Sequence, residues 1–329
     1  MRDIYTDLAL EIAEQLSDES GIDGVDMDIE KVDCIKVTTI KVTNEAGANA
    51  MGKPVGNYIT IESPAIKEAD VDSHEQIMRI MVDKLAAIRA GLNIAENASV
   101  LVIGLGNQDV TPDALGPQVV SKILVTRHII DSLPKSLLGG LRSLSALSPG
   151  VMGQTGIETA EIVKGLVQNT NPDLVIAVDA LAARNISRIN QTIQIADTGI
   201  SPGAGVGNHR TPLNQKTLGV PVIAIGVPTV ADASTFVNDA LDMFLAELAH
   251  DSPASLKDGA DFFAMLNELE DIDKKKVIKN TLDPVIGSMF VTPKEIGEVV
   301  RWLSNIIANA INMSMHKGIT KDDINRFMH

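Results

Sequence analysis

The chain has 329 residues, of which 45% are hydrophobic, so it can bury a sizeable core as one large domain or two small ones. Its 28 basic and 43 acidic residues give a formal charge of -15, which repels phosphate groups and so excludes nucleic acid and anionic membranes as expected direct partners. The one cysteine, Cys34, cannot form an intrachain disulfide. The chain shows neither a signal-peptide apolar run nor a membrane span, so we expect a cytoplasmic protein.

The N-terminal third predicts an acidic arm, a β-ribbon and a helix. Residues 1–30 are acidic, and we expect them to form a mobile arm with a short amphipathic helix at Leu8 to Gln15. Two stretches rich in β-branched residues, Cys34 to Val42 and Asn57 to Glu62, alternate as strands do and predict the ribbon. Apolar residues at helical spacing predict a helix over His74 to Leu92.

The rest of the chain alternates apolar runs with helical patterns. The runs are typical of parallel strands covered on both faces, and they occupy Ser99 to Leu105, Asp173 to Val178 and Pro221 to Val227. The helical patterns lie at residues 114–126, 157–168, 232–248 and 294–313. This alternation predicts an α/β fold, a doubly wound and mostly parallel sheet flanked by helices, with the ribbon added at about residues 30–65. Charged residues at about 250–280 predict a mobile insertion.

The first motif that can carry chemistry, GLGNQDVTPDALGP, begins at Gly104, where a predicted strand leads into a helix. Gly104, Gly106 and Asn107 form a candidate substrate-binding loop. The third glycine of a dinucleotide fingerprint is missing, which argues against a nucleotide site. Thr111 can cap the helix and Asp113 can balance its dipole. That local role is compatible with a carboxylate that also lines a cleft.

The second motif, VIAVDALAAR, places Asp179 at the carboxyl end of a predicted central strand, before a turn of small residues. A buried aspartate is costly unless it is hydrogen bonded, and α/β enzymes place functional groups at strand ends. Asp179 is therefore a candidate functional residue. The alternative is an aspartate that caps the next helix.

The third motif, DTGISPGAGVGN at residues 197–208, contains four glycines. Its candidate substrate-binding residues are Gly203, Gly205, Gly207 and Asn208. Such a loop can present backbone N–H groups to a peptide carbonyl, or it can be a tight surface loop. A similar loop at residues 148–156 could form the opposite wall of a cleft.

Other catalytic motifs are absent from the sequence. There is no GxSxG or HExxH, and Cys34 lies in the predicted ribbon, where no helix start activates it. The six histidines are scattered without a ligand partner at close spacing. The sequence therefore predicts no metal site and no cofactor.

Six motifs occur in order along the chain: GLGNQDVTPDALGP, VTRH, SPGVMGQTGIET, AVDALAAR, DTGISPGAGVGN and VPVIAIGVPTVADA. Together they resemble the germination proteases of spore-forming Firmicutes, from about Thr6 to beyond Glu295. The resemblance implies a fold similar to that of hydrogenase maturation endopeptidases and a homotetramer. It also implies that the two catalytic aspartates, in the TPDALGP and DALAAR motifs, are Asp113 and Asp179.

The resemblance further implies an endopeptidase, made as a zymogen, that starts the degradation of small acid-soluble spore proteins in the spore core. Such enzymes cut after an acidic residue that is followed by an aliphatic residue and alanine, with another acid shortly after. The arm carries this pattern in Thr6-Asp7-Leu8-Ala9-Leu10-Glu11, and again from Glu11 to Glu14. The family register places the cut between Asp7 and Leu8, so residues 1–7 would be a propeptide and 8–329 a single peptidase domain.

Two carboxylates that share one water give a mechanism for such a cut. Repulsion between their charges raises one pKa, so the charged member can take a proton from water while the protonated member assists the carbonyl, as in aspartic proteases. The rival mechanism is metal-assisted hydrolysis of the hydrogenase-maturation type, and the non-enzyme alternative is a nucleotide-binding module. The basic residues nearest the motifs, which could read an acidic substrate residue, are Arg127, Arg184, His209 and Arg210.

Overall fold

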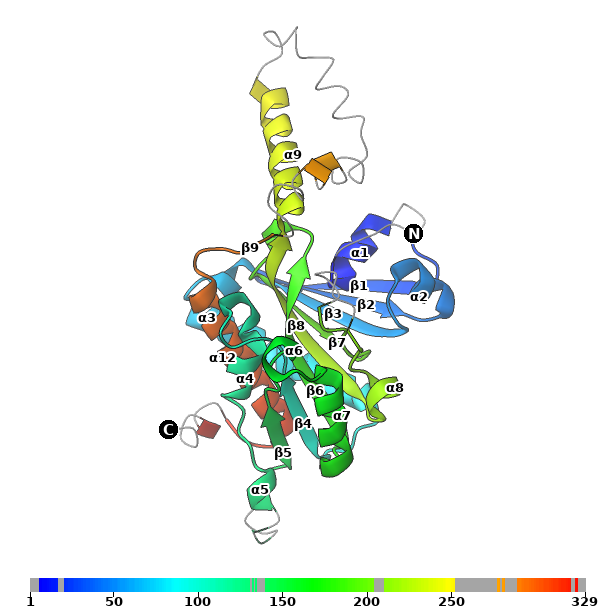
Figure 1. The fold of residues 1–329 in the computed structure, drawn as a ribbon, viewed down its shortest axis with the longest axis vertical. Helices are drawn as coiled ribbons and strands as arrows, with labels where there is room; N and C mark the ends of the chain where they lie inside the picture. Colours follow the sequence, from blue (N-terminus) through cyan, green and yellow to red (C-terminus); the bar gives the residue numbers. More distant parts are fainter. Residues whose placement is uncertain are drawn as a thin grey trace.

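One mixed β-sheet runs through the structure, a computed structural model that describes residues 6–16, 21–130, 132, 134, 140–203, 210–251, 277–278, 280–281, 289–320 and 323–324 (Figure 1). Its strands lie in the order β1-β2-β3-β7-β8-β6-β4-β5, and β9 pairs with β8. Their bounds are β1 Val25–Val32, β2 Ile35–Val42, β3 Gly56–Glu62, β4 Val100–Gly104, β5 Leu144–Leu147, β6 Leu174–Ala183, β7 Thr192–Ala196, β8 Val222–Asp232 and β9 Phe290–Val291.

Helices cover both faces of this sheet (Figure 1). The α-helices are α1 Ala9–Leu16, α2 Glu45–Met51, α3 Val71–Gly91, α4 Leu115–Val120, α5 Arg127–Ile130, α6 Met152–Thr155, α7 Thr159–Thr170, α8 Gln215–Leu218, α9 Ala233–Asp251 and α12 Ile296–Met315. The short 3-10 helices in the described part of the chain are η1 Pro64–Lys67, η2 Thr111–Asp113 and η4 Ile186–Arg188. Within the described residues, no helix combines the length and the apolarity that crossing a bilayer requires.

The centre of the sheet is parallel and confirms the predicted α/β fold. β5, β4, β6 and β8 pair in parallel, and every residue of β4 is buried, as its apolar run predicts. β4 lies between β5 and β6, so the connection from β4 to β5 and the connection from β5 to β6 run in opposite directions along the sheet. This reversal creates a switch point at the carboxyl end of β4. Ligands of α/β proteins bind at such points, and the first predicted motif begins here.

The ribbon joins this centre through β7, a strand that the sequence does not predict. β1, β2 and β3 pair antiparallel, as do β3 with β7 and β7 with β8. The sheet is therefore mixed rather than mostly parallel. The ribbon runs from Val25 to Glu62 instead of about 30–65. The extra strand, β1, is an edge strand whose residues after Val25 are exposed, so its sequence lacks a buried face.

Two helical layers enclose separate parts of the core. α3, α4 and α12 pack on one face, and α7 and α8 pack on the other. The helices predicted at residues 74–92, 157–168, 232–248 and 294–313 are confirmed as α3, α7, α9 and α12. The helix predicted at 114–126 is shorter, because α4 ends at Val120 and the amide of Asn312 on α12 bonds the backbone of Lys122 and Leu124 in the following loop.

The N-terminal arm is packed, and the prediction that it is mobile is wrong for residues 6–16. Leu8, Ala9 and Ala13 are fully buried, and α1 shares a core cluster with residues of the ribbon and of β7. The reason is that the apolar side of α1 faces the sheet while Glu14 on the other side is exposed. Residues 1–5, and all of the predicted insertion at 250–280 except 250–251, 277–278 and 280, lie outside the described residues.

Candidate active site

Asp179 lies within β6, one residue beyond the point where β4 stops pairing. The last pair between β4 and β6 joins Gly104 to Val178, so Asp179 has a neighbouring strand only on the β8 side, where it pairs with Gly226. The side chain is 6% exposed, and its Oδ1 accepts the N–H of Ala180 at 2.9 Å. Asp179 therefore faces the switch point as a nearly buried carboxyl group.

Two local predictions about Asp179 are wrong. Residues 180–183 stay in β6 and pair with β8 across a bulge, so no turn follows the aspartate. Small side chains suit this segment because it is buried between β8 and the N-terminal arm. Asp179 does not cap the next helix either, since that role at η4 belongs to Asn185, whose side chain accepts the N–H of Ser187.

Asp113 lies at the end of η2 and is held by the loop that leaves β4. Its Oδ2 accepts the backbone N–H of Asn107 at 2.7 Å. Gly106, with φ of 109°, lets this loop close, because a Cβ there would lie 2.0 Å from the carbonyl oxygen of Asp113. Gly106 and Asn107 thus hold Asp113 in place, whereas Gly104 lets β4 pack closely on α4, because a Cβ there would lie 2.2 Å from the carbonyl oxygen of Gly116. Thr111 offers no side-chain cap to η2, so its predicted capping role is wrong.

The two aspartates are electrostatically coupled. Burial raises the pKa of Asp113, opposed by the Asn107 N–H and the charge of Arg210. Burial raises the pKa of Asp179 well above its ordinary value, and the charges of Asp113 and Asp7 raise it further. Asp113 consequently ionises first, and its charge makes Asp179 keep its proton to higher pH. The pair can hold one proton, with one member a base and the other an acid.

The N-terminal arm lies against the strand that carries Asp179. The N–H of Asp7 donates to the carbonyl of Ala182 at 3.2 Å, and the Ala182 N–H donates to Oδ2 of Asp7 at 3.0 Å. Leu8 is fully buried in a cluster with Leu181 and Ala183 of β6. The bond between Asp7 and Leu8 therefore lies beside the strand that carries Asp179.

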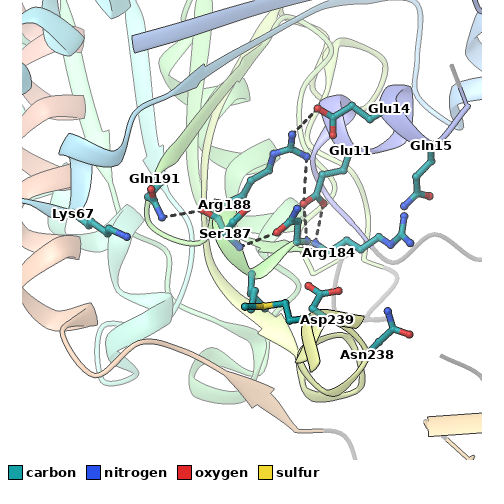
Figure 2. Close-up of a pocket in the computed structure, with 13 residues that line it drawn as sticks. Glu11, Glu14, Gln15, Lys67, Arg184, Ser187, Arg188, Gln191, Asn238 and Asp239 are labelled. Carbon is teal, nitrogen blue, oxygen red and sulfur yellow. Dashed lines mark hydrogen bonds and ion pairs between the residues drawn. The ribbon is translucent and has the colours of Figure 1, made fainter. Parts of the chain in front are cut away.

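The carboxylate of Glu11 is bound by the backbone that follows β6 (Figure 2). It is 3% exposed and accepts the N–H groups of Arg184 and Asn185, each at 2.8 Å, as well as the hydroxyl of Thr6. The guanidinium of Arg188 lies 3.8 Å from Glu11 and pairs with Glu14 at 2.7 Å. These groups line an open cavity of about 810 Å³. The carboxylate of Glu11, the fourth residue after the Asp7–Leu8 bond, is thus held by two backbone N–H groups.

The basic residues that the sequence singles out differ in their distance from the two aspartates and the arm. Arg184 contacts Glu11 through its backbone, and Arg210 acts electrostatically on both aspartates. Arg127 begins α5, which lies at the lower tip of the molecule and away from α1 (Figure 1). His209 lies outside the described residues. Arg188 was not predicted, and nothing in its spacing from the motifs marks it.

The glycine loops are described in part. Gly203 has a φ of 72°, which favours glycine, whereas Gly205, Gly207 and Asn208 lie outside the described residues. The loop at residues 148–156 does reach the first motif, because Nε2 of Gln154 donates to Oδ1 of Asn107 at 2.7 Å. In the described part of the chain, no three His, Cys, Asp or Glu side chains are grouped to hold a metal.

Comparisons with known proteins identify the family. Among solved structures, a NiFe hydrogenase maturation protease, HycI from Thermococcus kodakarensis, is 22% identical with a TM-score of 0.28, over 44% of this chain and 80% of that one. Relatives named germination protease come from Clostridium perfringens (45% identical over all of both chains), Caldanaerobacter subterraneus (45%, over 99% of this chain and 98% of the relative) and Bacillus velezensis (40%, over 99% and 97%). A family model described as germination protease matches residues 3–258 and 246–328. The chain therefore belongs to the germination protease family.

Proposed function

We propose that this protease of spore germination is an endopeptidase that processes itself at the Asp7–Leu8 bond and cuts small acid-soluble spore proteins at similar sequences. The observation that supports this most is the position of the arm. Asp7 is paired with β6, and its charge acts on Asp179. A segment with the substrate pattern therefore lies next to a coupled pair of carboxyl groups.

In this proposal Asp113 and Asp179 are the catalytic residues. Charged Asp113 takes a proton from the attacking water, and protonated Asp179 supplies one to the breaking peptide bond. The raised pKa of both groups supports this division, because the state with a single proton then extends above the ordinary range of carboxyl groups. Gly104, Gly106, Asn107 and the loop of Gly203, Gly205, Gly207 and Asn208 would form the walls of the cleft.

Residues 1–7 would be the propeptide, and the docked arm would keep other peptides out until it moves. The proposal includes a homotetramer in the forespore and spore core, with no cofactor and no bound nucleic acid. The direct test is to incubate the purified chain with a small acid-soluble spore protein and map the cuts by mass spectrometry. Cuts after Asp or Glu with an acid on the far side support the proposal, and absence of cutting or cuts unrelated to acidic residues contradict it.

Recognition of the second acid gives a separate prediction. Glu11→Gln is expected to slow self-cleavage by about tenfold or more, because charge-assisted hydrogen bonds to a buried carboxylate contribute about 1.5–3 kcal/mol. Glu14→Gln is the matched control. Its ion pair with Arg188 is half exposed, and such pairs contribute about 1 kcal/mol or less. Intact-mass time courses give both rates. Equal rates in the two variants would contradict the proposal that the enzyme recognises the carboxylate of Glu11.

A further inference from the structure

The carbonyl oxygen of Asp7 accepts hydrogen bonds from two side chains outside every predicted motif. Lys53 Nζ lies 3.0 Å from this oxygen and Gln194 Nε2 lies 3.2 Å from it. The other end of the Gln194 amide, Oε1, accepts the N–H of Ala9 at 2.7 Å. Gln194 therefore bonds the backbone on both sides of the Asp7–Leu8 bond, and the carbonyl that would be attacked already has two donors.

The sheet places these donors on the same face as Asp179. Gln194 on β7 pairs with Gly226 on β8, and Gly226 pairs with Asp179 on β6. Paired residues of adjacent strands point their side chains to the same face, so Gln194 and Asp179 stand in one row with Gly226 between them. Gly226 has no side chain of its own in this row, and the side chain of Leu181 fills its place, since a Cβ at Gly226 would lie 2.4 Å from Leu181. A cavity of about 200 Å³ adjoins Asp7, Lys53, Gln194 and Gly226.

The buried ammonium group of Lys53 is an unusual choice if its only role is to hold the arm in place. Burial lowers its pKa, and the charge of Asp7 acts in the opposite direction. Withdrawing an ammonium group from water is costly unless it gains a partner. Here the partner is a backbone carbonyl, which binds an ammonium far more strongly once it carries a negative charge. This difference between the ground state and the charged intermediate is the property of an oxyanion-binding group.

We propose that Lys53 and Gln194 are the oxyanion-binding residues of this protease, an assignment that rests on the proposed cleavage at Asp7. Water bonds to the carbonyl carbon of Asp7 and passes one proton to Asp113. The carbonyl oxygen becomes negative and is held by Lys53 Nζ and Gln194 Nε2. The C–N bond then breaks, and the nitrogen of Leu8 takes the proton of Asp179. The products are a carboxyl group on Asp7 and an amine on Leu8, and the aspartate pair still holds one proton.

The test compares self-cleavage of the full chain in wild type, Lys53→Met, Gln194→Met and the control Lys41→Met. Lys41 lies on the same ribbon and is exposed. Loss of one oxyanion donor slows catalysis by about 100- to 1,000-fold, so we expect that effect in the first two variants and a wild-type rate in the control. Hydrogen exchange of the arm amides measures docking separately from cleavage. Circular dichroism checks that each variant folds. If Lys53→Met does not fold, the result for Gln194→Met tests the assignment.

The outcomes separate this assignment from the proposed function. A fall of about 100-fold with unchanged protection of the arm amides supports the oxyanion role. Wild-type rates in Lys53→Met and Gln194→Met, or a fall no larger than the loss of docking, would overturn it and leave Lys53 a tether. If the wild-type chain itself does not cut between Asp7 and Leu8, the proposed self-processing fails, and the oxyanion assignment fails with it.

Discussion

Asp179→Asn is expected to reduce self-cleavage by about 10⁴-fold or more and, at the same time, to raise the melting temperature at neutral pH. The loss of activity follows because asparagine can neither hold nor release the proton that Asp179 would supply in the proposed mechanism. The gain in stability follows from burial, which raises the pKa of Asp179 well above its ordinary value with help from the charges of Asp113 and Asp7. A buried carboxylate beside two others destabilises the folded state once it ionises.

The pH dependence of this stability effect has a definite sign. A carboxyl group whose pKa is raised by folding stabilises the protein fully below its unfolded pKa, and that contribution is lost as the pH rises through the folded value. The wild-type chain should thus lose stability from mild acid towards neutral pH, and Asp179→Asn should lose less. Scanning calorimetry at several pH values measures this difference.

Asp109→Asn is the control, because Asp109 is exposed in the same loop as Asp113. Its self-cleavage rate and melting temperature should stay close to those of the wild type. Full activity in Asp179→Asn would remove this aspartate from the catalytic assignment. A lower melting temperature at neutral pH would show that the carboxylate stabilises the fold instead.

Leu10→Asp is expected to change two activities in opposite directions. Leu10 is 1% exposed and belongs to the cluster in which α1 packs on Ile40, Met51 and Tyr58. Truncating such a buried leucine costs about 2–5 kcal/mol, and a charge in its place costs more. The arm should spend most of its time undocked, so cleavage at Asp7 slows by about 100-fold, while the vacated cleft accepts other peptides.

A peptide of residues 4–15 measures the second activity. The full-length Leu10→Asp chain should cut this peptide in trans at least about tenfold faster than the wild type, because the wild-type α1 follows the proposed cut and would still cover this surface once the Asp7–Leu8 bond is broken. Gln15→Asp, a change near the end of the same helix, is the control and should alter neither rate. If trans cleavage slows together with self-cleavage, α1 supports the active site rather than blocking it.

The parallel centre of the fold could be predicted because buried strands leave an unambiguous pattern. β4 is apolar at each position since helices cover both faces, and α3 and α12 present apolar residues at helical spacing. β1 and β7 could not be assigned in the same way. β1 is exposed and charged. β7 is buried, but its 5 residues, TIQIA, include two polar side chains and so lack the continuous apolar run of β4.

In the candidate site, only the residues that lie in a local sequence motif could be predicted. Asp113 and Asp179 each follow a predicted strand, so their approach at the switch point follows from the α/β order. Lys53, Gln194 and Arg188 come to the arm only because the ribbon pairs with β7 and β7 pairs antiparallel with β8. These pairings join residues far apart in the chain and leave no mark in local spacing.

The packing of the N-terminal arm could not be predicted from its local sequence either. The sequence at Leu8 and Ala9 suits a substrate as well as it suits a buried segment. What decides between mobility and docking is the receiving surface, formed by Leu181 and Ala183 of β6 and by the ribbon. The same residues that make the arm resemble a substrate therefore make it part of the core.

The most direct measurement follows the intact mass of the purified full-length chain in mild acid, with and without a chelator. The account predicts loss of a fragment ending at Asp7, a new N-terminus at Leu8, and the same rate in both samples. It also predicts that neither Asp113→Asn nor Asp179→Asn shows this loss. Cleavage that requires a metal, that occurs at another bond, or that persists at the wild-type rate in either variant would contradict the paired-carboxylate account.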